Sequence, residues 1–465
     1  MRSKPTRARR HQSLTAVAVL TVPLVLVACG RSSSKSGGST TPTGSASSGA
    51  PASSAAASAA GDFGTQKAIC GKGKPGTTTA RGLTASEIRI GVTADPGAAV
   101  APGLEQEFFD TAEGFAKWCN DAGGINGRKI VVDKWDAKLF NVGQVVTSAC
   151  QKDFMLVGNG NALDATGVKV RLGCKLGQIP AYVVSPQATD AALQVQPSPN
   201  PADQINNGAL RLLTIKYPEV KTAGVCVMGS NLASLTPVGL RTKEYLQKLN
   251  IKVASYVEPP PQVDNWRPYM EQCKQSGAKA LYLETAQDPS PVIQAIKNTG
   301  WNPSYLWYSV QFYGPQGVAA ARAAKTFPPS YIQFPALPFE LADQYPVVKQ
   351  TADIVKAAVP GAKLTEFTLS AMSAWTLWAK SATACGADLT QDCILQKAGS
   401  LTDWDAGGLY APHSTQANAD ASPCITIVQM TPTGFVYAKD VTNPNQGSFN
   451  CEKDNVLPVK TYLTS

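Results

Sequence analysis

Short polar loops follow most of the stretches that have a strand-like apolar pattern. They contain hydroxyl, amide and carboxylate groups, which donate or accept hydrogen bonds and can fix the orientation of a small molecule. The loops are residues 94–102, 159–161, 185–189, 229–231, 284–288 and 310–314. Such groups are suited to binding a ligand.

Residues for nucleophilic catalysis are scarce. The sequence has two histidines. One, His11, lies in residues 1–28, which have the pattern of a removed signal; the other, His413, falls in a predicted crossover between lobes. The sequence has no Gly-x-Ser-x-Gly, which a hydrolase with a nucleophile elbow would need. Two carboxylates could still meet across a cleft and act as acid and base. A cleft hydrolase therefore stays as the weakest alternative, and we expect no enzyme.

The eleven cysteines divide into Cys29 and ten others. An even number in an exported protein indicates up to five disulfides, and the absence of Cys-x-x-Cys argues against a zinc or thioredoxin-like site. Sequence alone does not determine which cysteines pair. Closeness in the predicted fold suggests Cys150–Cys174, Cys226–Cys273, Cys385–Cys393 and Cys424–Cys451, which leaves Cys70 with Cys119.

Residues 71–76 match Gly-x-Gly-x-x-Gly by letter. A dinucleotide-binding loop must follow a strand and open a helix. This one precedes the first predicted strand and contains Pro75, so it predicts an irregular leader. We expect no cofactor and no bound metal.

The first 28 residues have the pattern of a secretory signal. Five basic residues and no acid precede an apolar run over residues 14–28, which is too short to span a bilayer. The segment ends in Leu26-Val27-Ala28-Cys29, which resembles the bacterial lipobox, so Cys29 is expected to carry a diacylglyceryl anchor. Two acyl chains anchor a protein stably, which predicts a location on the outer face of the cell membrane. The export route, general or twin-arginine, stays open.

Residues 29–61 follow the signal and consist almost entirely of Ser, Gly, Ala, Thr and Pro. Such a composition predicts a disordered tether. The net charge is +9 for the whole chain and +4 without the signal. A nearly neutral body does not indicate nucleic-acid binding, and we expect a monomer.

Residues 86–136 predict a strand, a loop, a helix, a turn and a second strand. Phe108, Ala112, Phe115 and Cys119 lie on one face of the helix, and two glycines, Gly123 and Gly124, end it. Strands joined through a helix are parallel, so the loop 94–102 opens at the carboxyl edge of a sheet, where α/β proteins bind ligands.

The same rhythm of strand, loop and helix continues to residue 184 and restarts at residue 224. Proline-rich or irregular stretches at 196–201, 327–339 and 401–413 predict three crossings between two lobes. Lobe 1 is expected to comprise 86–198 plus 335–410, and lobe 2 to comprise 199–334 plus 411–465. Two further helices, 341–359 and 366–384, are expected to pack on the lobes, with Trp375 and Trp378 in the core.

The chain resembles the type I periplasmic binding proteins of the branched-chain amino acid class, the solute-binding lipoproteins of ABC importers. The resemblance covers residues 86–437, and its most specific part is Gly123-Gly124-Ile125-Asn126-Gly127. It implies an α/β fold of two Rossmann-like lobes joined by a three-stranded hinge, with a ligand cleft between the lobes. It also implies that a small-molecule solute closes the lobes and that the closed form docks on a membrane permease.

The resemblance implies that lobe 1 holds a ligand carboxylate, through Asn159, Asn161, Ala162 and Thr189 with Gln187 beside them. In lobe 2, amino-acid binders have an acid where this chain has Gln311. Since an unpaired buried ammonium is costly, a simple α-amino acid fits poorly unless Asp95 or Asp288 provides the charge. The remaining expected contacts are Ser230, Asn231, Gln287, Tyr308 and Phe312.

These residues favour an amino-acid-like solute, an amide or an aromatic acid as the ligand. The same fold also serves as a ligand sensor for a membrane receptor kinase. Importer and sensor therefore both stay open from the sequence.

Overall fold

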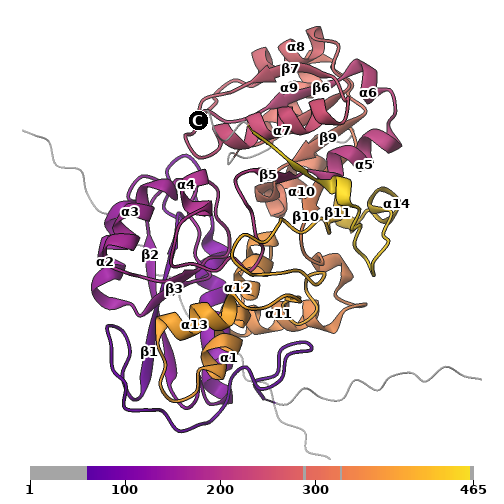
Figure 1. Ribbon diagram of the computed structural model, residues 1–465. Helices are drawn as coiled ribbons and strands as arrows, with labels where there is room; N and C mark the ends of the chain where they lie inside the picture. Colours follow the sequence, from indigo (N-terminus) through magenta and orange to yellow (C-terminus); the bar gives the residue numbers. More distant parts are fainter. Residues whose placement is uncertain (1–59, 286–289, 325–326, 461–465) are drawn as a thin grey trace, which may run out of the picture. The chain divides into compact units, whose positions relative to one another are not determined.

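The computed structural model describes residues 60–285, 290–324 and 327–460. Cys29, the signal, most of the expected tether, Gln287 and Asp288 lie outside these ranges. Within the described part of the chain, no helix has the length and apolar character that crossing a membrane would require. Helices and strands alternate along most of it and form two α/β lobes (Figure 1).

Lobe 1 is built on a four-stranded parallel sheet. Its strands are β1 (Glu87–Ala94), β2 (Lys129–Asp136), β3 (Met155–Val157) and β4 (Gln178–Ile179), in the order β2-β1-β3-β4. The connecting helices are α1 (Gln106–Ala122), α2 (Val142–Lys152), α3 (Ala165–Gly173) and the short α4 (Pro186–Thr189). The predicted opening unit is confirmed, because Glu87 pairs with Lys129 and the register runs in parallel to Ala94 and Asp136.

Lobe 2 is built on a seven-stranded sheet in the order β12-β11-β10-β9-β8-β6-β7. Its parallel strands are β6 (Val225–Met228), β7 (Val253–Val257), β8 (Ala280–Leu283), β9 (Tyr305–Tyr308) and β10 (Ser330–Phe334). The hairpin β11 (Thr426–Thr431) and β12 (Gly434–Tyr437) completes the sheet in antiparallel fashion. Its helices are α5 (Gly208–Lys216), α6 (Val220–Ala223), α7 (Thr236–Lys248), α8 (Arg267–Gln275), α9 (Ser290–Thr299) and α10 (Pro315–Ala324).

The segment 327–339 differs in part from the expected crossing. Its prolines lie on both sides of an alternating run, Ser330–Phe334, which forms β10 and pairs with β9 and β11. Proline is excluded from the interior of a paired strand but tolerated at its ends, so the chain leaves the sheet only at Pro335. The Ala336 backbone then pairs with Tyr410, which brings two crossings side by side.

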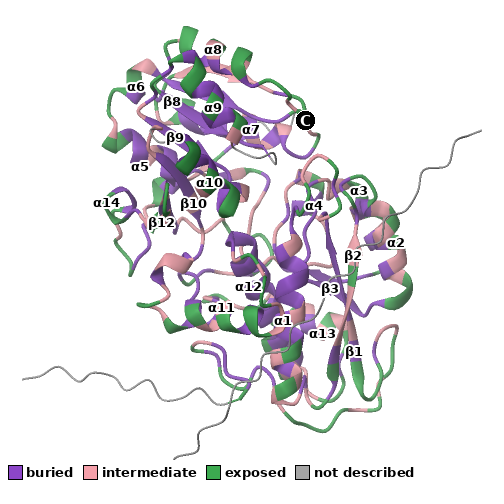
Figure 2. Ribbon diagram, turned by 180° about the vertical axis from the view of Figure 1, so that it is seen from behind, coloured by how far each residue is buried: buried purple, intermediate pink, exposed green. Residues whose placement is uncertain are grey.

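The helices α11 (Pro346–Ala358), α12 (Glu366–Ala384) and α13 (Gln391–Ala398) pack with lobe 1, although they follow lobe 2 in the sequence (Figure 1). Helix α12 is buried along almost its whole length, whereas the outer helices α2 and α8 expose one face (Figure 2). Trp375 and Trp378 are fully buried in it, as predicted. Short elements complete the chain: β5 (Gln204–Asn206) pairs with β13 (Val456–Pro458), and α14 (Lys439–Thr442) follows β12.

Five disulfides join Cys70 to Cys119, Cys150 to Cys174, Cys226 to Cys273, Cys385 to Cys393, and Cys424 to Cys451. These are the pairs expected from the order of the elements. Each closes a loop within one part of the chain, so each restricts the unfolded state locally.

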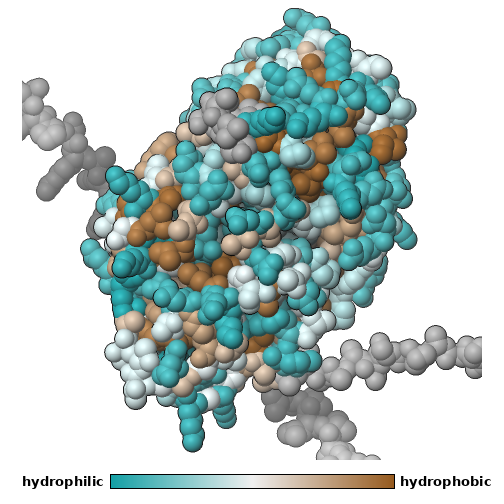
Figure 3. Space-filling view, viewed as in Figure 1, coloured by the Kyte–Doolittle hydropathy of each residue, from teal (hydrophilic) through white to brown (hydrophobic). Residues whose placement is uncertain are grey.

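The surface is mainly hydrophilic on the face shown in Figure 3, and its hydrophobic residues gather in separate patches on both lobes. Among the described residues, the large apolar side chains that are more than a third exposed are Phe140, Ile215 and Val436, which lie far apart in the sequence. Aromatic side chains are therefore concentrated elsewhere, in the two cores and along the cavity described next.

Candidate functional site

Both lobes line a cavity of about 310 Å³, here called the interlobe cavity. Lobe 1 contributes the start of α1, the segment after β4 and the start of α12. Lobe 2 contributes α7 and the ends of β8, β9 and β10. The polar and aromatic side chains of its lining include Glu105, Tyr182, Arg241, Tyr282, Glu284, Trp307, Gln311, Glu366 and Phe367. A volume of this size is at the lower end of the range for small organic ligands, about 300–1,000 Å³.

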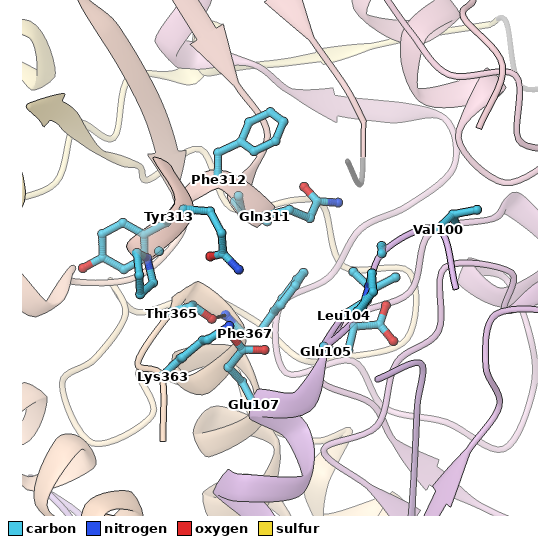
Figure 4. Close-up of a pocket in the computed structure, with 17 residues that line it drawn as sticks. Val100, Leu104, Glu105, Glu107, Gln311, Phe312, Tyr313, Lys363, Thr365 and Phe367 are labelled. Atoms are coloured by element: carbon cyan, nitrogen blue, oxygen red, sulfur yellow. Dashed lines mark hydrogen bonds between the residues drawn. The ribbon is translucent and has the colours of Figure 1, made fainter. Parts of the chain in front are cut away.

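A second cavity of about 280 Å³, here called the rim cavity, adjoins the first. The two share Leu104, Glu105, Val310, Gln311 and Phe367. Figure 4 shows Gln311 and Tyr313 of lobe 2 on one side of it and Lys363, Thr365 and Phe367 of lobe 1 on the other, while the Phe312 ring points away from the lobe 1 residues. The two cavities are thus neighbouring parts of one cleft. Ser234 of lobe 2 donates a hydrogen bond to the Ala162 carbonyl of lobe 1 beside the interlobe cavity.

Glu105 is a buried carboxyl group on the lobe 1 wall. It precedes α1 with φ 63°, a left-handed conformation that costs a residue other than glycine about 1–3 kcal/mol. Tyr182 donates a hydrogen bond to Oε1, while Oε2 has no partner among the described residues. Burial raises the pKa of Glu105 well above its ordinary value, and the nearby negative charge of Asp95 raises it further. Burial therefore favours the protonated, uncharged form of this group.

Two aromatic residues, Tyr182 and Phe367, also line the lobe 1 wall. Tyr182 stacks on Phe367, with ring centroids 5.5 Å apart and an angle of 21° between the planes. Phe108 packs against both, at 5.6 Å from Tyr182 and 5.3 Å from Phe367. Glu366 begins α12 beside this cluster, accepts a hydrogen bond from Ser370, and has its pKa raised to about 7 by burial.

The lobe 2 wall is formed by residues at the ends of neighbouring strands. Tyr282 and Trp307 are directly opposite on β8 and β9, and their rings stack with centroids 4.5 Å apart. The Tyr282 hydroxyl donates a hydrogen bond to Glu284 Oε2 at 3.1 Å. Arg241 reaches the cavity from α7, and its Nη1 donates to the carbonyl of Gln204 at 3.2 Å.

The buried carboxyl group of Glu284 gives a prediction about pH. Burial raises its pKa from 4.5 to about 7, so between these values the folded protein holds a proton that the unfolded chain has lost. The free energy of unfolding should therefore fall as pH rises through this window, by about 3 kcal/mol for this group. Glu284→Gln should remove that part of the slope and be more stable than wild type at pH 8 but not at pH 4, as measured by urea unfolding.

The matched control for this prediction is Glu87→Gln, which changes an exposed glutamate on β1. It should leave the pH profile of wild type unchanged. Parallel profiles for wild type and Glu284→Gln would contradict the assignment of Glu284 as a neutral buried acid.

The carboxylate of Asp95 forms hydrogen bonds within lobe 1. Its two carboxylate oxygens accept hydrogen bonds from the main-chain amides of Leu139, at 2.7 Å, and Ala162, at 3.0 Å. It lines neither the interlobe cavity nor the rim cavity. Its carboxylate therefore fastens two loops together beside the cleft.

Other expected contacts of lobe 1 also make internal hydrogen bonds. Asn161 accepts one from Thr93 at 2.6 Å, and Asn159 donates one to Gln178 at 3.4 Å. The Thr189 hydroxyl donates to the Ser185 carbonyl at 2.9 Å, and Gln187 is exposed. Of the ligand contacts expected in lobe 1, only Ala162 lines the interlobe cavity.

Thr189 lies instead on a cavity of about 880 Å³, formed with residues 190–201, 392–400 and 415–419. Although it is larger, no aromatic and no basic residue lines it within the described chain. The interlobe cavity has both kinds, so we take it as the candidate binding site.

In lobe 2 the expected contacts divide. Gln311 lines both parts of the cleft, and Phe312 lines the rim cavity. Tyr308 is fully buried in the core, where its ring meets that of Phe312 edge-on at 5.0 Å. Ser230 is buried but lines neither part of the cleft, and Asn231 is exposed.

Several lining residues were not predicted. Glu284 had a detectable signal, because it is the first polar residue after the apolar strand β8. Arg241 had none, since it lies in the middle of a helix where a charged residue ordinarily faces solvent. His413 is buried away from the cleft: its Nδ1 is 2.8 Å from the Ala411 carbonyl and its Nε2 is 2.6 Å from the Pro197 carbonyl, where it joins two crossings.

Two α/β lobes with a cavity that both lobes line define a two-lobed solute-binding protein. Residues 87–434 match the model of the periplasmic binding protein family, and the chain belongs to this family. Membership implies a small-molecule solute, a membrane ABC permease as the partner and an extracytoplasmic location, and proteins of this family are generally not enzymes.

Solved structures share this type I fold. A fatty acid ABC transporter substrate-binding protein from Thermomonospora curvata superposes with a TM-score of 0.66 at 15% identity, over 81% of this chain and 96% of its own. The branched-chain amino acid binding protein LivJ from Streptococcus pneumoniae, in complex with isoleucine, gives 0.61 at 15% identity, over 75% and 98%. A possible leucine/isoleucine/valine-binding protein from Rhodopirellula baltica gives 0.62 at 12% identity, over 77% and 98%. The search of curated proteins gave no match.

Proposed function

We propose that this protein is the extracytoplasmic solute-binding lipoprotein of an ABC importer, which closes its lobes on a small organic solute and presents it to the permease. The observation that carries this proposal is the interlobe cavity, because both lobes of a periplasmic binding protein contribute to its walls. A ligand that contacts both walls would stabilise the closed arrangement. The lobe boundaries proposed are 86–198 plus 335–410 and 199–334 plus 411–465.

The solute is proposed to be amino-acid-like, an amide or an aromatic acid. The apolar and aromatic walls support a ligand with an apolar body, and Gln311 and Glu284 are within the lining to hydrogen-bond polar groups. The names of the structural relatives widen the range to be tested to branched-chain amino acids and fatty acids.

A thermal-shift screen of the purified chain tests the function. The panel comprises amino acids, amides, ureas, aromatic acids and fatty acids. A ligand present at 100 times its dissociation constant should add about 2.7 kcal/mol to the free energy of unfolding. Binding without chemical change supports the proposal, and turnover of a hit, or no hit in a panel extended to sugars and nucleosides, would contradict it.

The proposed anchor is a diacylglyceryl group on Cys29, followed by the tether up to residue 61. The expected result is that the wild-type chain fractionates with the membrane and that Cys29→Ala is released from it. Release of the wild-type chain under the same conditions would contradict the anchor and leave the solute-binding proposal untouched.

A further inference from the structure

The guanidinium group of Arg241 lies buried in the wall of the interlobe cavity without an acidic partner. The side chain is 4% exposed, and among the described residues no carboxylate lies within ion-pair distance of it. Its Nη1 donates to the carbonyls of Gln204, at 3.2 Å, and Ala202, at 3.5 Å. Its Nε has no hydrogen-bond partner in the described chain, and no bond from Nη2 is found there.

An uncompensated buried charge is expensive. Burial lowers the pKa of Arg241, but a guanidinium stays protonated in proteins. Removing a charge from water without an ion-pair partner costs several kcal/mol, and neutral carbonyls offset only part of that. Buried charges of this kind are typical of functional sites, where a ligand of opposite charge can offset the cost of burial.

Trp307 provides a second unused donor in the same wall. It is 6% exposed, and its indole Nε1 has no hydrogen-bond partner among the described residues. The rings of Tyr282 and Trp307 stack, and Arg241 lines the same cavity as both. Two residues with unpartnered donors therefore line one wall of the cavity, and a carboxylate is an acceptor suited to both.

The acids of the cavity do not neutralise Arg241. Burial raises the pKa of both Glu284 and Glu366 to about 7, and that of Glu105 well above its ordinary value. Glu284 is bonded to Tyr282, Glu366 to Ser370 and Glu105 to Tyr182. Burial thus favours the neutral form of all three groups, and each already has a hydrogen-bond partner, so the positive charge in this wall is available to a ligand.

We propose that Arg241 and the Trp307 indole hold the carboxylate of the transported solute, which is a small carboxylic acid with an aliphatic or aromatic body. The body packs toward lobe 1 against Tyr182 and Phe367, which close the far side of the same cavity. This inference rests on the proposed function and specifies its ligand class. It also places the carboxylate on lobe 2, opposite to the lobe 1 position that the family resemblance implies.

The test compares ligands that differ only in the head group. Hexanoate, hexanamide and hexylamine form one series, and 3-phenylpropanoate, its amide and its amine form another. Dissociation constants are measured by calorimetry on the full chain at pH 6.5. The carboxylates should bind about 10–150-fold more tightly than the amides, because a charge-assisted hydrogen bond adds about 1.5–3 kcal/mol, and the amines should bind most weakly.

Two variants examine the two donors separately. Arg241→Met should weaken carboxylate binding at least about 30-fold and change amide binding little. Because the two carbonyls bonded by Nη1 could make this variant unstable, Trp307→Phe provides a second measurement: it keeps the stacked ring, removes only the N–H, and should weaken carboxylate binding about 3–10-fold. The control Arg267→Met removes an exposed arginine of α8 and should have no effect.

The outcomes separate this inference from the proposed function. Tight binding of amines, or equal binding of the three head groups, would overturn the carboxylate assignment while the chain remained a solute-binding protein. Preserved carboxylate affinity in both variants would overturn the role of the two residues. If no compound of either series or of the wider screen binds, the proposed function fails as well.

Discussion

Replacing Trp375 by alanine is expected to lower the free energy of unfolding by about 3–5 kcal/mol. The side chain is fully buried in α12, where it stacks on Phe115 of α1 at 5.3 Å and meets Trp378 edge-on at 5.6 Å. Removing an indole leaves a cavity that the helices cannot collapse without losing their contact with the sheet. Urea unfolding followed by circular dichroism measures the loss.

Two further variants make this prediction specific. Trp118→Ala changes a partly buried tryptophan of α1, which contacts Phe63 and Phe115, and should cost clearly less. Trp375→Phe keeps most of the apolar volume and should also cost less than the alanine change. A loss for Trp375→Ala no larger than that for Trp118→Ala would show that α12 is not the centre of the lobe 1 core.

Replacing Gly124 by alanine is expected to cost at least about 2 kcal/mol. Gly124 has φ +79°, and an added Cβ would lie 2.0 Å from the Arg128 carbonyl oxygen, so the turn between α1 and β2 would have to open. Gly123 and Gly127 also have positive φ values, 120° and 85°. The glycines that make this stretch the most specific part of the family resemblance are therefore required by the backbone.

The control for Gly124→Ala is Gly173→Ala, at the end of α3. An added Cβ there meets no atom within 4 Å, and its φ is not positive. Since alanine favours helices over glycine by up to about 1 kcal/mol, this change should be neutral or slightly stabilising. If both alanine variants gave the same free energy of unfolding, the explanation of the turn would be incorrect.

The ligand orientation proposed here has a consequence for lobe closure. Arg241 also bonds the carbonyls of Ala202 and Gln204, in the segment that leads from the first crossing into lobe 2. A carboxylate on its free edge would therefore be bound by a side chain already attached to that segment. Ligand binding would then be coupled, through one residue, to the segment by which the chain enters lobe 2.

Much of the fold followed from the sequence because its signals are local. Apolar runs of four to eight residues, helical spacing and glycines at turns gave β1, α1, β2 and α12 with nearly correct limits. The prolines around residues 199, 335 and 338 interrupted the strand and helix pattern between lobes. The missed elements include α10 and α13, which are short helices rich in alanine or polar residues, whose patterns are weak.

The binding site followed much less well. Of the described residues expected to contact ligand, Ala162 and Gln311 line the interlobe cavity, and Phe312 lines the rim cavity. The sequence correctly indicated polar loops at the ends of strands. However, Asp95, Asn161 and Thr189 form hydrogen bonds to other residues of lobe 1. A polar residue near main-chain groups satisfies them first, and sequence does not show which residues remain free.

By itself, then, the sequence determined the class of the protein: the alternation of strands and helices, two lobes, the family turn at residues 123–127, and the scarcity of catalytic residues. The tertiary structure decided which side chains meet between the lobes. Arg241, Trp307 and Phe367 come from a helix, a strand and a helix that are far apart in sequence. Their convergence depends on how two sheets with separate cores pack against the same cleft, and no local pattern encodes that geometry.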